Sequence, residues 1–123
     1  RKVEDINRTL DIFIKNYNDY DSLRTVYEID KTPFKMYQID DNKLKPLLPN
    51  FNDLKEPFNC CRQIFPKTYL HNGYIDILKP KLLNDNMISG NKIYPYQMSS
   101  NDNIDLDSKD DWLKLETLLK KNK

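Results

Sequence analysis

Hydrophobic residues at the start of the chain recur at helical spacing. From Lys2 to Tyr17 they stand three or four positions apart, or side by side on the same face, at Val3, Ile6, Leu10, Phe13, Ile14 and Tyr17. This period places them on one stripe of a helix. The pattern predicts an amphipathic helix over residues 2–17, ended by the polar residues 18–22.

The middle of the chain has the pattern of strands. β-Branched, aromatic and alternating positions predict strands at 23–29, 34–39, 69–78 and 92–98. Asp40-Asp41-Asn42 predicts a turn that brings residues 43–48 back along the second strand. Within the third strand, Asn72-Gly73 indicates either a bulge or a hairpin turn.

The remaining segments are irregular or helical. Prolines at 49, 57 and 66 predict an irregular ordered loop between them. Pro80 should start a short helical turn through Leu83. A last helix is predicted at 108–120, with its apolar residues inward, namely Trp112, Leu115, Leu118 and Leu119. Because helices and strands alternate, the predicted fold class is α/β.

Composition narrows the possible functions. The 123 residues suffice for one domain, with 38% hydrophobic residues, 32% charged residues and a mean hydropathy of -0.82, so part of the core is expected from a partner. The formal net charge of +1 argues against bulk attraction to nucleic acid or to anionic membranes.

No apolar run approaches the ~20 residues of a membrane span, and no basic-then-apolar leader opens the chain, which predicts a cytoplasmic protein. Cys60 and Cys61 are expected to be free thiols, because adjacent cysteines rarely meet disulfide geometry.

Two carboxylates near the end of the chain are candidate metal ligands. In Ile104-Asp105-Leu106-Asp107, an extended backbone would project both acids to one side and both apolar residues to the other. Paired carboxylates suit Mg²⁺, which is usually held together with phosphate oxygens and water. The alternative is that Asp107 caps the last helix and Asp105 is solvated.

Two cations are candidate ligands for an anion. Arg62 lies in the irregular segment and could bind a carboxylate or phosphate with two parallel hydrogen bonds, and Lys35 could add a second positive charge. The alternative for both is an ordinary surface pair. With Gly73 and Gly90 as the only glycines, the chain cannot form a glycine-rich phosphate loop.

The order of these features resembles that of the acylneuraminate cytidylyltransferases. The matching pieces are Arg1 with the helix after it, Pro33-Phe34-Lys35, Arg62-Gln63-Ile64-Phe65-Pro66, Asn72-Gly73 and Asn103-Ile104-Asp105-Leu106-Asp107. They are similar to the end of the family's Ser-Pro-Leu-Arg and to its Pro-x-Lys, Arg-Gln-x-x-Pro, Asn-Gly and Ser-Ile-Asp-Ile-Asp. The resemblance covers residues 1–123, about the second half of a family member.

This resemblance implies a fold and an activity. The fold would be the second half of a Rossmann-like three-layer nucleotidyltransferase domain, with a dimerisation arm at about 34–58. Asp105 and Asp107 would bind the Mg²⁺ that the CTP phosphates also ligate. Lys35, Arg62 and Asn72 would bind the sugar acid, partly across a homodimer. The anomeric hydroxyl of the acid would attack the α-phosphate of CTP, and pyrophosphate would leave.

Departures from the family pattern leave the sugar open. Asp76 stands where sialic-acid enzymes often have an aromatic, and Ile88-Ser89 stands where they place aromatics near the sugar. These departures argue against N-acetylneuraminate and leave legionaminic, pseudaminic or ketodeoxy acids. The family's basic nucleotide-binding loop lies in its first half, so this chain alone is not expected to turn over CTP. The alternatives are another sugar nucleotidyltransferase or a non-catalytic dimerisation module.

Overall fold

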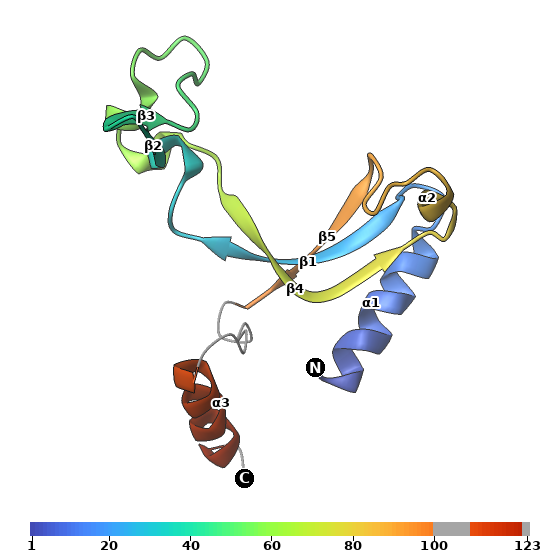
Figure 1. The fold of residues 1–123 in the computed structure, drawn as a ribbon. Helices are drawn as coiled ribbons and strands as arrows, with labels where there is room; N and C mark the ends of the chain where they lie inside the picture. The colour runs from blue at the N-terminus through green and yellow to red at the C-terminus, as the bar shows by residue number, and fades with distance from the viewer. Residues whose placement is uncertain (100–108, 122–123) are drawn as a thin grey trace.

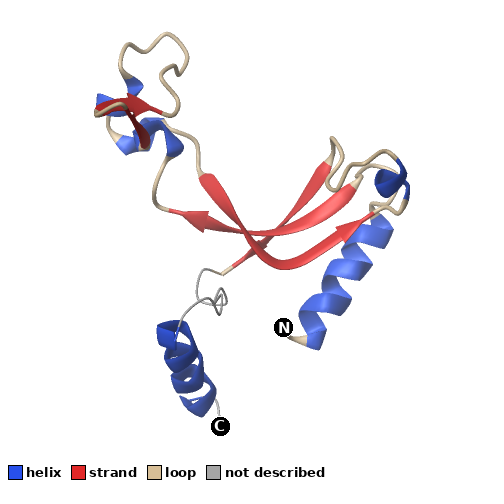
Figure 2. Ribbon diagram, in the orientation of Figure 1, coloured by secondary structure: helices blue, strands red, loops and turns tan. Residues whose placement is uncertain are grey.

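A three-stranded sheet is the centre of the computed structural model, which describes residues 1–99 and 109–121 (Figure 1). Its strand order is β4-β1-β5. β1 (Ser22–Ile29) pairs with β4 (Thr68–Leu78) antiparallel and with β5 (Ile93–Met98) parallel. Together with a two-stranded hairpin and three α-helices, this gives a small mixed α/β domain over the described residues (Figure 2). The predicted α/β class and the predicted strands 23–29, 69–78 and 92–98 are confirmed.

Helix α1 (Val3–Lys15) confirms the predicted first helix, but its apolar stripe is mostly uncovered. Thr9 and Phe13 are buried on the flank that faces the sheet. Val3 remains 70% exposed and Ile14 68% exposed, and the other members of the stripe are also exposed. The periodicity therefore identified one face of the helix, and the sheet covers only its edge.

Two further helices follow strands β4 and β5 along the chain. α2 (Lys81–Asn84) follows Pro80 as predicted, and α3 (Lys109–Lys121) matches the predicted last helix. Trp112 of α3 is 58% exposed, so the expectation that it faces inward is wrong, whereas Leu115 on the same helix is half-buried. The side chains of Leu118 and Leu119 lie outside the described ones. None of the helices in the described ranges is long and apolar enough to cross a bilayer.

An arm extends from the sheet between β1 and β4 (Figure 1). It contains the hairpin of β2 (Tyr37–Asp40) and β3 (Lys43–Pro46), as the Asp40-Asp41-Asn42 turn predicted. Asp41 and Asn42 both have positive φ, at 49° and 58°, which these residue types tolerate better than most. The hairpin is followed by 3-10 turns η2 (Pro57–Asn59) and η3 (Arg62–Ile64) inside the segment predicted to be irregular.

The predicted strand 34–39 begins later than expected. Pro33–Lys35 forms the 3-10 turn η1, and the Thr32 hydroxyl accepts a hydrogen bond from the Phe34 amide at 3.4 Å. Proline fixes φ near the helical value at the first position of a turn, and threonine caps it, so these two residues override the strand pattern. β2 starts only at Tyr37.

Three phenylalanines pack together at the base of the arm. The ring of Phe34 stacks on that of Phe65 with centroids 4.8 Å apart, and Phe51 meets both rings edge-on at 4.6 and 5.2 Å. Phe65 is buried. This cluster holds η1 against the segment that follows η3 and so fixes the base of the arm.

The other end of the sheet is held by a carboxylate. Asp21 Oδ2 accepts hydrogen bonds from the amides of Asn91 and Lys92, both at 3.1 Å. These two bonds stabilise the charged form and lower the pKa of Asp21. Gly90 lies against the same side chain with φ at +69°, and a Cβ there would stand 2.5 Å from Asp21 Cβ. Asp21 therefore fixes where β5 begins beside β1.

Candidate functional site

A hollow opens where β1 ends and the arm returns to β4. We call it the arm-base hollow, and its volume is about 270 Å³. It is lined by Glu28, Ile29, Asp30, Thr32, Arg62, Gln63, Phe65, Pro66, Lys67 and Thr68. Arg62, predicted from sequence as an anion ligand, is therefore on the wall of a concave site.

Arg62 is held by the end of β1 and remains accessible. Its Nη1 donates to the backbone oxygen of Asp30 at 3.0 Å and lies 3.3 Å from the Asp30 carboxylate. The Arg62 side chain is 57% exposed and that of Asp30 is 93% exposed. Exposed pairs of this kind contribute about 0–1 kcal/mol, so an incoming carboxylate can replace Asp30 at little cost. The backbone bond would keep the guanidinium in place during that exchange.

A second ion pair lines the same hollow. Lys67 Nζ donates to Glu28 Oε2 at 2.9 Å. This hydrogen bond raises the pKa of Lys67, because it favours the ammonium form. Lys67, Glu28 and Asp30 were not predicted as site residues. The signal that could have indicated the two acids is their spacing: residues 28 and 30 alternate with Ile29 at the end of a strand, so both project to one side.

Lys35, the second predicted cation, lies at the arm base but does not line the hollow. It ends η1 and is exposed, and its side chain makes no hydrogen bond or ion pair within the described ranges. Its neighbour Phe34 stacks on Phe65, which follows the turn that contains Arg62. The aromatic contact therefore places η1, which ends at Lys35, beside the residue that follows η3.

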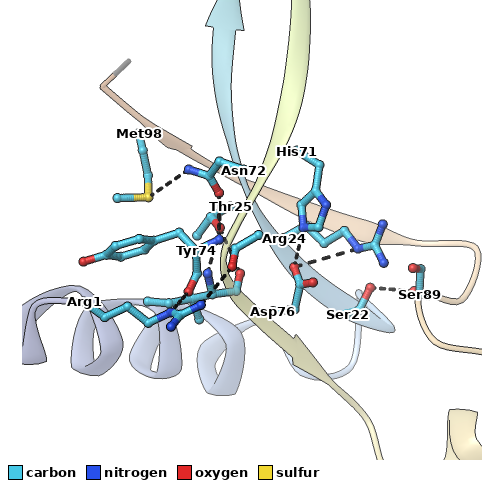
Figure 3. Close-up of polar contacts among 12 residues, drawn as sticks. Arg1, Ser22, Arg24, Thr25, His71, Asn72, Tyr74, Asp76, Ser89 and Met98 are labelled. Atoms are coloured by element: carbon cyan, nitrogen blue, oxygen red, sulfur yellow. Dashed lines mark hydrogen bonds and ion pairs between the residues drawn. The ribbon is translucent and has the colours of Figure 1, made fainter. Parts of the chain in front are cut away.

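Asn72 lies in the middle of the sheet, in a bulge of β4 (Figure 3). Its Oδ1 accepts hydrogen bonds from the Thr25 hydroxyl at 2.6 Å and from the Tyr74 amide at 3.1 Å, and its Nδ2 lies 3.6 Å from Met98 Sδ. Asn72 is 6% exposed. The bulge alternative is thus confirmed over the hairpin turn, and both ends of the Asn72 amide are engaged inside the sheet.

The structure does not bring Asn72 to Arg62. Asn72 bonds to Thr25, whereas Arg62 bonds to Asp30, five positions later. At ~3.3 Å per residue, that separation is about 16 Å along the strand. A substrate-binding role for Asn72 stays a prediction, separate from the arm-base hollow.

Arg1 ties the start of α1 to this bulge. Its Nη2 donates to the Gly73 oxygen at 3.1 Å and its Nε to the Tyr74 oxygen. The Tyr74 hydroxyl in turn donates to Asp5 Oδ2 at 3.0 Å. The arginine of the family-like motif therefore connects helix and sheet in this chain.

His71 belongs to a cluster of charges on one face of the sheet (Figure 3). Its Nε2 lies 3.0 Å from Asp76 Oδ1, and Arg24 Nε lies 3.9 Å from the same oxygen. Arg24 is directly opposite Asp76 in the β1–β4 register, and Val26 is opposite His71. Arg24–Asp76 is therefore a half-exposed cross-strand pair, of the kind that stabilises a sheet, whereas His71 and Asp76 lie on the same strand, on either side of the bulge.

The predicted metal ligands Asp105 and Asp107 lie outside the described residues. Within residues 1–99 and 109–121, no group of three or more histidine, cysteine, aspartate or glutamate side chains could hold a metal ion. Cys60 and Cys61 are free thiols, as expected.

A comparison of the chain with models of known protein families gives no match.

Proposed function

We propose that this chain is the sugar-acid-binding part of a cytidylyltransferase that transfers CMP from CTP to a nonulosonic, sialic-acid-like sugar acid and releases pyrophosphate. The observation that carries the proposal is Arg62 on the wall of the arm-base hollow, exposed and oriented by a backbone hydrogen bond. The guanidinium fork matches a carboxylate with two parallel hydrogen bonds. The ordered set of family-like motifs supplies the identity of the reaction.

The proposed chemistry is mainly positioning. Arg62 holds the carboxylate of the sugar acid, and Lys35 adds positive charge from the neighbouring turn. The anomeric hydroxyl of the acid then forms a bond to the α-phosphorus of CTP as the bond to pyrophosphate breaks, and the hydroxyl proton is released to solvent. No protein nucleophile is needed, because holding the two substrates in line removes much of the barrier. When bound, Mg²⁺ would neutralise phosphate charge, and Asp105 and Asp107 are the proposed ligands from this chain.

The fold is consistent with the second half of a Rossmann-like three-layer nucleotidyltransferase. β1 and β5 are parallel neighbours, which is the pairing that crossover connections produce. Ligands of such sheets bind beyond the carboxyl ends of the strands, and the arm-base hollow lies at that end of β1. The free thiols Cys60 and Cys61 suit a reducing, cytoplasmic setting.

We also propose that residues 34–58 form a dimerisation arm. The cross-strand pair Ile39 and Leu44 is exposed, at 78% and 64%, and Leu47 and Leu48 are exposed beside it. A two-stranded hairpin is marginal in water without further packing. A second copy of the chain would cover these apolar side chains and stabilise the hairpin.

The test is a pyrophosphate-release assay on the gene product that contains this chain. We expect release with CTP and a nonulosonic acid, and little with UTP or GTP. Asp105→Asn and Asp107→Asn should each lower kcat at least ~100-fold, because each removes several kcal/mol of charge stabilisation. Asp110→Asn, an exposed acid in the first turn of α3, is the matched control and should keep normal turnover.

The other outcomes separate the competing functions. Equal release with UTP or GTP, or with a phosphorylated sugar, would favour a different sugar nucleotidyltransferase. Near-normal turnover of both aspartate variants would remove the proposed metal site. Absence of release with every nucleotide and acid, in a folded dimer, would favour a non-catalytic dimerisation module.

A further inference from the structure

The arm-base hollow contains two acidic and two basic side chains, which form two ion pairs. Glu28 and Asp30 project from alternate positions of one extended segment, and each holds one cation, Lys67 and Arg62 respectively. The array is neutral overall. A site that only captured an anion would not need two carboxylates on its wall, because they repel the ligand.

We propose that Glu28 and Lys67 form a hydroxyl-binding subsite beside Arg62, so that the hollow accepts a polyhydroxylated monocarboxylate and rejects a phosphorylated sugar. The inference rests on the proposed function, since it assumes that Arg62 takes a carboxylate. It adds two residues to the site and selects between substrate classes that the sequence left open.

Hydrogen-bond chemistry explains why this pair suits hydroxyl groups. A hydroxyl donates one hydrogen and accepts others, so it can donate to Glu28 and accept from Lys67. The existing bond between Lys67 and Glu28, at 2.9 Å, shows that the donor and the acceptor converge on one point. Neighbouring hydroxyls on a sugar present the same two functions a short distance apart. Lysine is an ammonium donor throughout the neutral range at its ordinary pKa, and the hydrogen bond from Lys67 to Glu28 raises that pKa further.

Electrostatics explains the exclusion of phosphate esters. A phosphate monoester carries close to two negative charges at neutral pH and would stand near both Glu28 and Asp30. A carboxylate carries one charge, and it can displace Asp30 from Arg62 while the sugar hydroxyls satisfy Glu28. The hollow of about 270 Å³ is at the small end for ligand sites, which suits one sugar ring. Phe65 and Pro66 add apolar lining for the carbon face of that ring.

Calorimetric titration of the gene product that contains this chain tests the inference, with and without CMP. The probes are legionaminate, pseudaminate, a ketodeoxy nonulosonic acid, their methyl esters and glucose 1-phosphate. At least one free acid should bind, its ester should bind at least ~10-fold more weakly, and glucose 1-phosphate should not compete. These ratios correspond to the loss of one charged hydrogen-bonding group.

Four variants separate the inference from the function. Lys67→Met and Glu28→Gln should each raise the Kd of the acid about 10-fold, as expected for one lost hydrogen bond to a charged group. Arg62→Met should abolish binding. Lys120→Met is the matched control, because Lys120 forms an exposed ion pair with Glu116 in α3, which neither lines the hollow nor belongs to the proposed dimerisation arm. Far-ultraviolet circular dichroism checks that each variant is folded.

Each result has a defined meaning. If Arg62→Met abolishes binding while the Lys67 and Glu28 variants bind as tightly as the parent, the hydroxyl subsite is refuted and the proposed function stands. Glucose 1-phosphate binding as tightly as the acid would also refute the subsite. If no acid binds the parent protein, the carboxylate site at Arg62 is refuted, and both proposals fall.

Discussion

The hydrogen bonds of Thr25 should decide whether the bulge in β4 forms. Its hydroxyl accepts from the Ile75 amide at 2.9 Å and lies 2.6 Å from Asn72 Oδ1 and 3.0 Å from the Ile75 oxygen. Thr25 has one hydroxyl hydrogen, so it can donate fully to only one of the two oxygens, and the shorter distance favours Asn72. Thr25→Val keeps the shape of the side chain and removes all of these bonds.

The structure sets the size of the effect. Thr25 is fully buried, so valine would leave the Ile75 amide without its acceptor, at a cost of about 1–3 kcal/mol. Asn72 Oδ1 would keep the Tyr74 amide and lose only one of its two donors. We expect Thr25→Val to lower the free energy of unfolding by about 2–3 kcal/mol. Thr25→Ser keeps the hydroxyl and loses one methyl group, at about 1 kcal/mol.

Urea unfolding followed by circular dichroism measures these differences. Combining Thr25→Val with Asn72→Ala gives a double-mutant cycle, and we expect a coupling energy of about 1–2 kcal/mol between the two sites. The reasoning is refuted if Thr25→Val is no more destabilising than Thr25→Ser. It is also refuted if the two substitutions are additive within about 0.5 kcal/mol.

Two other predictions concern the junction of β1 and β5 at Asp21. Gly90→Ala should destabilise the chain by clearly more than the ~1–2 kcal/mol that a left-handed alanine costs, because its Cβ would collide with Asp21. Gly73 has a similar positive φ, 61° against 69°, but lies in open space, so Gly73→Ala should cost only the backbone strain. Equal costs for the two alanines, in the same urea experiment, would contradict this. Hydrogen bonds from two amides lower the pKa of Asp21 below its unfolded value of about 3.9, so its contribution to stability is present above about pH 4 and is lost as the pH falls through the folded pKa. The Asp21→Asn variant should therefore be less stable than the parent at pH 6, and this difference in the free energy of unfolding should shrink as the pH falls to 2.5. If the two plots of unfolding free energy against pH run parallel, the prediction is wrong.

Helices and turns were predicted correctly where residues close in sequence determine them. The three- and four-residue spacing before Tyr17 located α1, and Asp40-Asp41-Asn42 located the hairpin turn, because both depend on residues close in sequence. The prediction that the second strand begins at residue 34 was wrong, because the proline turn at Pro33–Lys35, capped by Thr32, competes locally with the strand pattern. Burial was harder to predict. The spacing showed that Val3 and Phe13 share a stripe but not that the sheet covers only Phe13.

The candidate site was only partly predictable, because it forms through long-range contacts. Arg62 was identified by its side-chain chemistry, but its position depends on the Asp30 backbone, far away in sequence. Phe34, next to Lys35, stacks on Phe65, three positions after Arg62, and no spacing rule reveals this contact. Asn72-Gly73 correctly indicated a bulge, and the side-chain amide of Asn72 makes its contacts with Thr25, Tyr74 and Met98 within the sheet.

The ends of β1 and β5 explain how the two proposed parts of the site could meet. Met98, the last residue of β5, pairs with Tyr27, three positions before Asp30, so the strand ends about 10 Å short of the Asp30 side of the hollow. The seven residues from Met98 to Asp105 can span at most about 24 Å when fully extended. Chain length therefore allows Asp105 and Asp107 to reach the rim beside Arg62. Under the proposed function, the carboxylate of the sugar and the phosphates of CTP would lie within one substrate length of each other. The parallel pairing of β1 and β5 is the feature of the fold on which such joint binding would depend.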